Sequence, residues 1–187
     1  MQKYDFYIIK KSSTFVTNYM LESLITSKTR LRLLIKFFLN IANKGYLNSL
    51  ANEFGESTNS VRKELNNLSS AGYLEKQSEN NKVIYKANAS HPLFQIIQKI
   101  VHKHLGIEEI LETVYNRIGD VKKIMILGDY AKGIDSGIIE ILIVGDNINK
   151  EYLDEISPKI ELKIKRKVSF FVSNKSLKQK SLTIFEA

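Results

Sequence analysis

Two short amphipathic segments joined by a turn constrain the fold of this 187-residue chain more than any other feature. Each segment repeats apolar side chains at the three- and four-residue spacing of a helix. The first pattern stops at Gly55 and the second at Gly72, and residues 56–59 between them offer hydroxyl caps. The pattern predicts a short helix, a tight turn and a second helix, which is a helix-turn-helix. Its apolar positions are Leu47, Leu50, Ala51, Phe54, Val61, Leu65 and Leu68.

Two strand-like segments follow this pair of helices. They cover residues 73–76 and 82–86, and the residues between them include Asn80 and Asn81. Asparagine tolerates the positive φ that a hairpin turn requires. A helix-turn-helix followed by a hairpin predicts a winged helix.

The outer face of the second helix carries side chains suited to nucleic acid. Arginine can bond guanine with two hydrogen bonds and asparagine can bond adenine, whereas serine and lysine suit phosphate. Two lysines on the hairpin are placed to reach the DNA backbone or the minor groove. The predicted DNA-binding residues are Asn59, Ser60, Arg62, Lys63, Asn66, Asn67, Lys76 and Lys82. Lys28, Arg30 and Arg32, near the start of an earlier helix, are further candidates for phosphate contacts.

Other interpretations of this face remain open. Any surface helix exposes polar and basic residues, and a winged helix can also dock onto protein or bind RNA. The distribution of charge favours DNA, because residues 1–106 hold 15 Lys and Arg against 7 Asp and Glu, whereas residues 107–187 hold 13 of each. A positive surface confined to one part of a chain suits phosphates or acidic lipids. A proteome with a general preference for lysine would give a similar excess.

Helical patterns flank the predicted winged helix. The first follows Thr26 and Ser27, repeats apolar residues from Leu31 to Ile41, and is expected to end at residues 43–45, where Gly45 can adopt the left-handed backbone. After the winged helix, Pro92 suits the first position of a long apolar helix that runs to residue 105. A further helix is predicted for residues 107–118.

The periodicity changes after residue 119. Residues 121–127 and 138–144 are nearly continuous apolar runs, typical of buried central strands, and residues 168–172 indicate a third strand. Residues 149–167 have a helical pattern that Pro158 is expected to kink or divide. The last dozen residues are polar enough to fray. The predicted class is α+β, with an N-terminal arm (1–21), a winged helix-turn-helix (22–90), connecting or dimerisation helices (91–119) and a small α/β domain (120–187).

A loop in the last part resembles a known family. The segment LGDYAKG (127–133), with Glu140 on the next strand, is similar to the minimal nucleotidyltransferase fold, in which a GSxAxG turn cradles a triphosphate and an Asp-x-Asp strand holds divalent metals. Gly128, Ala131 and Gly133 match the turn, with Tyr130 and Lys132 between them, whereas Asp129 replaces the serine and puts a negative charge where the triphosphate would lie.

The carboxylates of that family are mostly missing. Ile138 stands at the first Asp position, Glu140 at the second, and Ser169 or a neighbour at the third. A lone Glu140 cannot hold two metal ions about 3.5–4 Å apart. We therefore expect no catalytic residues, no metal and no cofactor, and a residual nucleotide loop formed by Gly128, Asp129, Tyr130, Ala131, Lys132, Gly133 and Glu140.

A wider resemblance covers residues 22–172. The segments LITSKTRLRLLIKFFLN, STNSVRKELNNLSSAGYL and HPLFQIIQKIV look like bacterial regulators that fuse an ArsR/MarR-like winged helix to a nucleotidyltransferase-like domain. The resemblance implies a transcriptional regulator that binds double-stranded DNA, with a non-catalytic second domain used for dimerisation, for sensing a small molecule or nucleotide, or for partner contact. A homodimer is expected, through residues 92–105 or the α/β domain, because one recognition helix reads few bases.

Several classes are excluded or left as alternatives. The chain has no cysteine, which excludes disulfides and thiolate sites. No apolar run reaches the roughly 18–20 residues that span a bilayer, so we expect a cytoplasmic protein without a membrane partner. His102 and His104 lie two apart on a helix and point away from each other, which argues against a shared metal ion. The alternatives are a nucleotidyltransferase using Glu140 and Asp129, and a winged-helix scaffold for protein binding.

Overall fold

The structure is a computed structural model that describes residues 24–79, 81–115, 118–175 and 180–187. These residues form seven helices and two sheets, so the protein is of the α+β class. The predicted N-terminal arm lies outside the described residues. In chain order the elements are α2 (Lys28–Phe38), β1 (Lys44–Tyr46), α3 (Leu47–Phe54), α4 (Thr58–Ser70), β2 (Leu74–Glu79), β3 (Lys82–Ala87), α5 (Phe94–Leu105), α6 (Ile107–Tyr115), β4 (Asp120–Ile126), α7 (Gly128–Ala131), β5 (Ile138–Asp146), α8 (Lys150–Ile164), β6 (Lys167–Ser173) and β7 (Leu182–Glu186).

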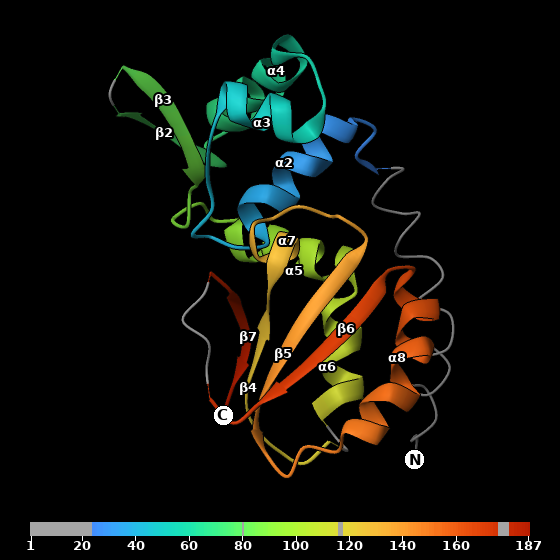
Figure 1. Cartoon of the computed structure of the whole chain (residues 1–187). Helices are drawn as coiled ribbons and strands as arrows, with labels where there is room; N and C mark the ends of the chain where they lie inside the picture. The colour runs from blue at the N-terminus through green and yellow to red at the C-terminus, as the bar shows by residue number, and fades with distance from the viewer. Residues whose placement is uncertain (1–23, 80, 116–117, 176–179) are drawn as a thin grey trace, which may run out of the picture.

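The N-terminal half packs α2, α3 and α4 beside a three-stranded antiparallel sheet of order β1-β3-β2. The side chain of Ser27 caps α2 by accepting from the amide of Arg30, and that of Ser57 caps α4 by accepting from the amide of Ser60. The predicted pair of helices and the hairpin are therefore present as α3, α4, β2 and β3. In Figure 1 the hairpin projects away from the rest of the molecule beside α3 and α4.

The first helix ends earlier than its pattern predicts. It stops at Phe38, and Gly45 lies in β1, opposite Tyr85 of β3. A β-carbon at residue 45 would lie 2.8 Å from the side chain of Leu50, so this glycine lets β1 approach α3 closely rather than ending a helix. The hairpin is also tighter than predicted, since β2 runs to Glu79 and Asn81 turns the chain with φ of 60°.

Helix α5 lies between the two groups of elements (Figure 1). It begins at Phe94, so Pro92 precedes the helix instead of starting it. Gly106 separates α5 from α6 with φ of 79°, a left-handed conformation that suits glycine. A β-carbon there would lie 2.4 Å from the side chain of Ile164, so α8 also packs tightly against this turn.

The C-terminal half is a four-stranded sheet of order β6-β5-β4-β7, in which only the β5–β6 pair is parallel. Helices α6 and α8 lie on one side of this sheet (Figure 1). The expectation that the end of the chain frays was wrong, because Leu182–Glu186 form β7, which pairs with β4. Pro158 does not divide α8, which runs from Lys150 to Ile164, and a kink at this proline stays a prediction. Pro158 and Asp154 are both exposed, so water can hydrate the carbonyl that loses its N–H partner.

One hydrophobic core runs through both halves. It includes Phe37 and Leu65 from the first half, Leu105 from α5, and Ile141 and Ile160 from the second. The predicted boundaries at residues 90 and 119 remain predictions, since this core crosses both. No helix among the described residues is long and apolar enough to cross a membrane.

Candidate nucleic-acid interface

The orientation of α4 follows from its buried side. Val61 and Leu65 are fully buried and Leu68 is 6% exposed, which turns the opposite side of the helix to solvent. All six predicted contact residues of α4 are exposed: Asn59, Ser60, Arg62, Lys63, Asn66 and Asn67. The helix is 13 residues long, about 20 Å, enough to lie along a major groove.

Two of these residues and Lys82 of the hairpin line one groove between α4 and the hairpin. The groove has a volume of about 500 Å³ and is lined by Arg62, Asn66 and Lys82, among others. Lys76, on β2, donates to the side-chain oxygen of Asn66 at 3.2 Å and lies 5.8 Å from the ring centre of Tyr85. The structure thus joins the predicted residues of α4 to those of the hairpin.

Tyr46 also lines this groove, although the sequence interpretation did not include it. Its hydroxyl donates to Glu79 at 3.0 Å, which links β1 to the far end of β2. The residue was missed because β1 is only three residues long, too short to show a periodic pattern.

The start of α4 is held by a polar cluster from α2. The Thr29 hydroxyl lies 3.1 Å from that of Ser60 and also donates to Glu56, in the turn before α4. Arg32 donates to Glu56 at 2.6 Å and to the carbonyl of Phe54 at 2.9 Å. These contacts connect α2 to the α3–α4 turn and fix where α4 begins.

Arg30 and Arg32, which the sequence suggested as phosphate contacts, instead form ion pairs within the protein. Arg32 is held as described, and Arg30 pairs with Glu64 at 2.8 Å. Burial tends to raise the pKa of Glu64, but hydrogen bonds from Ser27 and Arg30 outweigh burial and keep that pKa below its usual value. Lys63 and Lys82 form no ion pair with another described residue, so their charges are available to phosphate.

The loop that resembles a nucleotide-binding turn is compact. Gly128 has φ of 59°, and the Glu140 carboxylate occupies the space that a β-carbon at residue 128 would fill. Tyr130 and Ala131 are fully buried, and Lys132 lies 3.5 Å from Asp129. The carbonyl of Ala131 accepts from the Asn40 side chain at 2.8 Å, so this loop contacts the N-terminal half.

The sheet face beside this loop carries both apolar and charged side chains. A cavity of about 630 Å³ there is lined by Gly128, Lys132, Glu140, Phe171 and Lys180, among others. Ser169 lies opposite Glu140 on β6, and the next pair on this face is Leu142 and Phe171. No group of three metal-ligating side chains occurs among the described residues.

A partly exposed ion pair lies behind the loop, and sequence reasoning did not find it. Arg166 donates to both carboxylate oxygens of Asp135, at 3.0 and 2.6 Å, and Tyr130 donates to the same carboxylate. Burial raises the pKa of Tyr130 and the nearby carboxylate raises it further. For Asp135, burial acts to raise the pKa, but the hydrogen bonds and charge of Arg166 dominate and lower it.

Comparison with known proteins gives two distant likenesses. No protein-family model and no curated protein matches the chain. Among solved structures, it is similar to the antimony-specific transcriptional repressor AntR, with 20% identity, a TM-score of 0.37, and coverage of 60% of this chain and 92% of that one. It is also similar to Sso10a-2, a DNA-binding protein from Sulfolobus solfataricus, with 17% identity, a TM-score of 0.33, and coverage of 46% and 88%. Function must therefore be inferred from the residues of this chain.

Proposed function

We propose that this protein is a sequence-specific, double-stranded-DNA-binding transcriptional regulator. Its N-terminal half acts as a winged helix-turn-helix, with α4 as the recognition helix and the β2–β3 hairpin as the wing. Its C-terminal half acts as a nucleotidyltransferase-like domain without catalysis, used for sensing or dimerisation.

The observation that carries the proposal is the groove shared by α4 and the hairpin. Arg62 and Asn66 are exposed on one side of α4, and Lys82 faces the same groove from the hairpin. In DNA recognition, arginine and asparagine on a helix in the major groove bond base edges, and basic residues beside them neutralise phosphates. One surface of this protein offers both kinds of group.

The first test measures binding by fluorescence anisotropy to duplexes selected from a random library, with scrambled duplex and double-stranded RNA as comparators. Arg62→Ala should weaken binding to the selected duplex by about 1–3 kcal/mol, or about 5- to 150-fold, and affect scrambled duplex less. Lys63→Ala should weaken binding to both duplexes equally. It should also reduce the slope of the logarithm of the binding constant against the logarithm of the salt concentration by about one. Lys163→Ala, on the exposed side of α8, is the matched control and should change nothing.

Two outcomes would contradict this proposal. Equal losses for Arg62→Ala on selected and scrambled duplex would remove its base-reading role. Absence of duplex binding at low salt would favour the protein-docking scaffold, and tighter binding to RNA would favour an RNA-binding module.

A homodimer belongs to the same proposal, with α5 as its contact. Leu93, Ile96 and Ile100 follow one another at helical spacing and are 42%, 53% and 42% exposed. An apolar stripe on the surface suits self-association. A twofold pair that reads successive major grooves needs its recognition helices about 34 Å apart, one turn of DNA. Sedimentation velocity of Ile96→Asp with Ile100→Asp should show monomer. Leu162→Asp, at an isolated position that is 83% exposed, is the control and should leave the dimer intact.

The absence of catalysis rests on the family's three carboxylate positions, of which Glu140 alone keeps an acid. Glu140 faces Ser169 and lies beside Leu142 and Phe171, where two-metal chemistry needs further acidic ligands. We expect no transfer of a labelled nucleotide with magnesium or manganese. Transfer by the unmodified protein that Glu140→Gln abolishes would overturn this part and favour a nucleotidyltransferase.

A further inference from the structure

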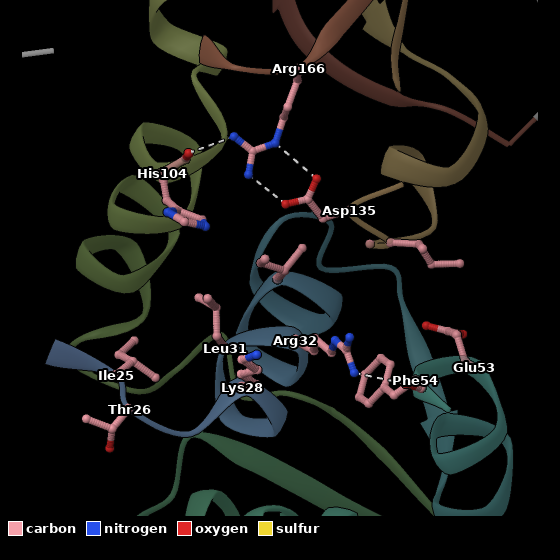
Figure 2. A pocket seen from close by; sticks show the side chains of 13 residues that line it. Ile25, Thr26, Lys28, Leu31, Arg32, Glu53, Phe54, His104, Asp135 and Arg166 are labelled. Atoms are coloured by element: carbon pink, nitrogen blue, oxygen red, sulfur yellow. Dashed lines mark hydrogen bonds and ion pairs between the residues drawn. The ribbon is translucent and has the colours of Figure 1, made fainter. Parts of the chain in front are cut away.

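A cavity at the junction of the two halves is distinct from the groove beside α4 and from the cavity beside Glu140, although Gly133 at the end of the residual loop lines it. Its volume is about 670 Å³, within the roughly 300–1,000 Å³ of small-molecule sites. Figure 2 shows Lys28 and Leu31 of α2 on one side and Asp135 and Arg166 on the other, with Phe54 at the end of α3. Segments from both halves of the chain therefore build its wall.

Most charges in this wall are already compensated. Asp135 accepts two hydrogen bonds from the Arg166 guanidinium, and a third guanidinium nitrogen donates to the carbonyl of His104. Glu53 receives the Lys36 ammonium at 2.9 and 2.7 Å. Neither carboxylate is left to attract a cation, and Arg166 has few donors left to attract an anion.

The two other charged side chains in the wall are the cations Lys28 and Arg32, and Arg32 already pairs with Glu56 at 2.6 Å. Lys28 is exposed and forms no ion pair with another described residue. Arg32 uses one guanidinium nitrogen, Nη1, for both of its contacts, to Glu56 and to the carbonyl of Phe54, which leaves other donors for a ligand. Apolar side chains complete the wall: Ile25, Leu31, Ile35, Phe54 and Ile134.

We propose that this cavity binds a small organic carboxylate with an apolar body, held by Lys28 and Arg32, and that this binding lowers the affinity of the protein for DNA. The binding site stands on the cavity alone, whereas its effect on DNA rests on the proposed function. The acid's carboxylate pairs with the two cations, and its body covers the apolar wall.

The contacts of Arg32 connect this cavity to the recognition helix. Arg32 holds Glu56, which accepts from Thr29, and the Thr29 hydroxyl lies 3.1 Å from that of Ser60 in the first turn of α4. A carboxylate bound to the other guanidinium nitrogens neutralises part of the charge of Arg32 and so weakens its attraction for Glu56. The turn before α4 is then held less firmly, which disfavours the helix position that binds DNA.

The binding test uses 2-naphthoate as the probe and its neutral amide, 2-naphthamide, as the matched comparator, with protein free of DNA. Titration calorimetry should show one saturable site per chain for the acid and at least about tenfold weaker binding of the amide. Lys28→Gln should weaken binding of the acid by about fivefold to tenfold and leave binding of the amide unchanged. Lys163→Gln, outside the cavity, should leave both unchanged, and Ile134→Trp should weaken both by filling the cavity.

The coupling test uses Glu56→Gln, which removes the competing negative charge. Linkage requires opposite effects: 2-naphthoate should bind about threefold more tightly, and DNA more weakly, than with the unmodified protein. A variant that merely destabilised the fold would weaken both. With the unmodified protein, saturating 2-naphthoate should lower DNA affinity by about fivefold or more.

The outcomes separate this inference from the proposed function. Saturable binding of the acid by a protein that ignores every duplex would retain the ligand site and remove the regulator. Acid and amide binding equally, an unchanged affinity in Lys28→Gln, or no acid binding up to about 1 mM would overturn the site. Unchanged DNA affinity with the acid bound would overturn the coupling.

Discussion

Replacement of Gly133 by alanine tests the packing of the two halves against each other. Gly133 follows α7 with φ of 76°, and a β-carbon there would lie 2.6 Å from both the Cα and the carbonyl oxygen of Lys36 in α2. It would also lie 2.9 Å from the Asn43 side-chain nitrogen, which donates to that same carbonyl. These neighbours are mostly backbone atoms, which cannot rotate away as a flexible side chain can.

Two costs add in this variant. The left-handed backbone costs an alanine about 1–2 kcal/mol, and forcing a methyl group into packed backbone costs about 1–3 kcal/mol more. We therefore expect Gly133→Ala to lower the free energy of unfolding by about 2–5 kcal/mol. Gly55→Ala isolates the first cost, because Gly55 has φ of 64° and nothing within 4 Å of its would-be β-carbon. That control should lose only about 1–2 kcal/mol.

Urea unfolding followed by far-ultraviolet circular dichroism measures both variants. The difference between them reports the contact between α2 and the loop after α7. If Gly133→Ala lost no more stability than Gly55→Ala, to within about 0.5 kcal/mol, the close approach would be wrong. The shared wall of the cavity would then be wrong with it.

Three other predictions concern pH and the sheet face. The pKa of Asp135 lies below its ordinary 3.8, so the Asp135–Arg166 ion pair stabilises the fold fully above pH 3.8 and loses this contribution as the pH falls through the lowered pKa. Asp135→Asn should therefore lower the urea midpoint at neutral pH and make the midpoint fall less steeply in acid. Burial lowers the pKa of His102 below 6.5, so stability should fall as pH drops from that value, and His102→Gln should reduce this slope in urea titrations between about pH 7 and pH 5. Glu140→Gln should leave DNA affinity unchanged in anisotropy measurements, because Glu140 faces the sheet cavity and not α4; a clear loss would link that cavity to DNA binding.

Local patterns explain which elements could be predicted. Helices α3 and α4 each bury a regular apolar stripe and end near a glycine, so periodicity and backbone preference agree. Strands β4 and β5 are nearly continuous apolar runs because both are interior strands of their sheet. The exposed residues of α4 followed directly from knowing its buried ones, which is why the six candidates on that helix were all correctly assigned to the surface.

Long-range contacts explain what could not be predicted. Gly45 was expected to end a helix, yet its role is to admit the Leu50 side chain against β1. A glycine can serve either purpose, and sequence alone does not distinguish them. The strand β7 has only a weak alternation of apolar residues, and it becomes a strand by pairing with β4, about 60 residues earlier in the chain. The Asp135–Arg166 pair was missed for the same reason, whereas Tyr46 was missed because β1 is only three residues long.

Several contacts that the sequence did not predict lie where the two halves meet, which bears on how the protein could work. Asn40 bonds Ala131 across 91 positions, Gly133 rests on Lys36, and Arg166 donates to the carbonyl of His104. A shared, densely packed core transmits displacement because it has little free volume to absorb it. A ligand that binds between α2 and the loop after α7 can move one half relative to the other or rearrange Arg32. Either change acts on α2, the helix that holds the start of α4. In a protein whose halves were joined only by a flexible linker, the same ligand would have no such route to the recognition helix.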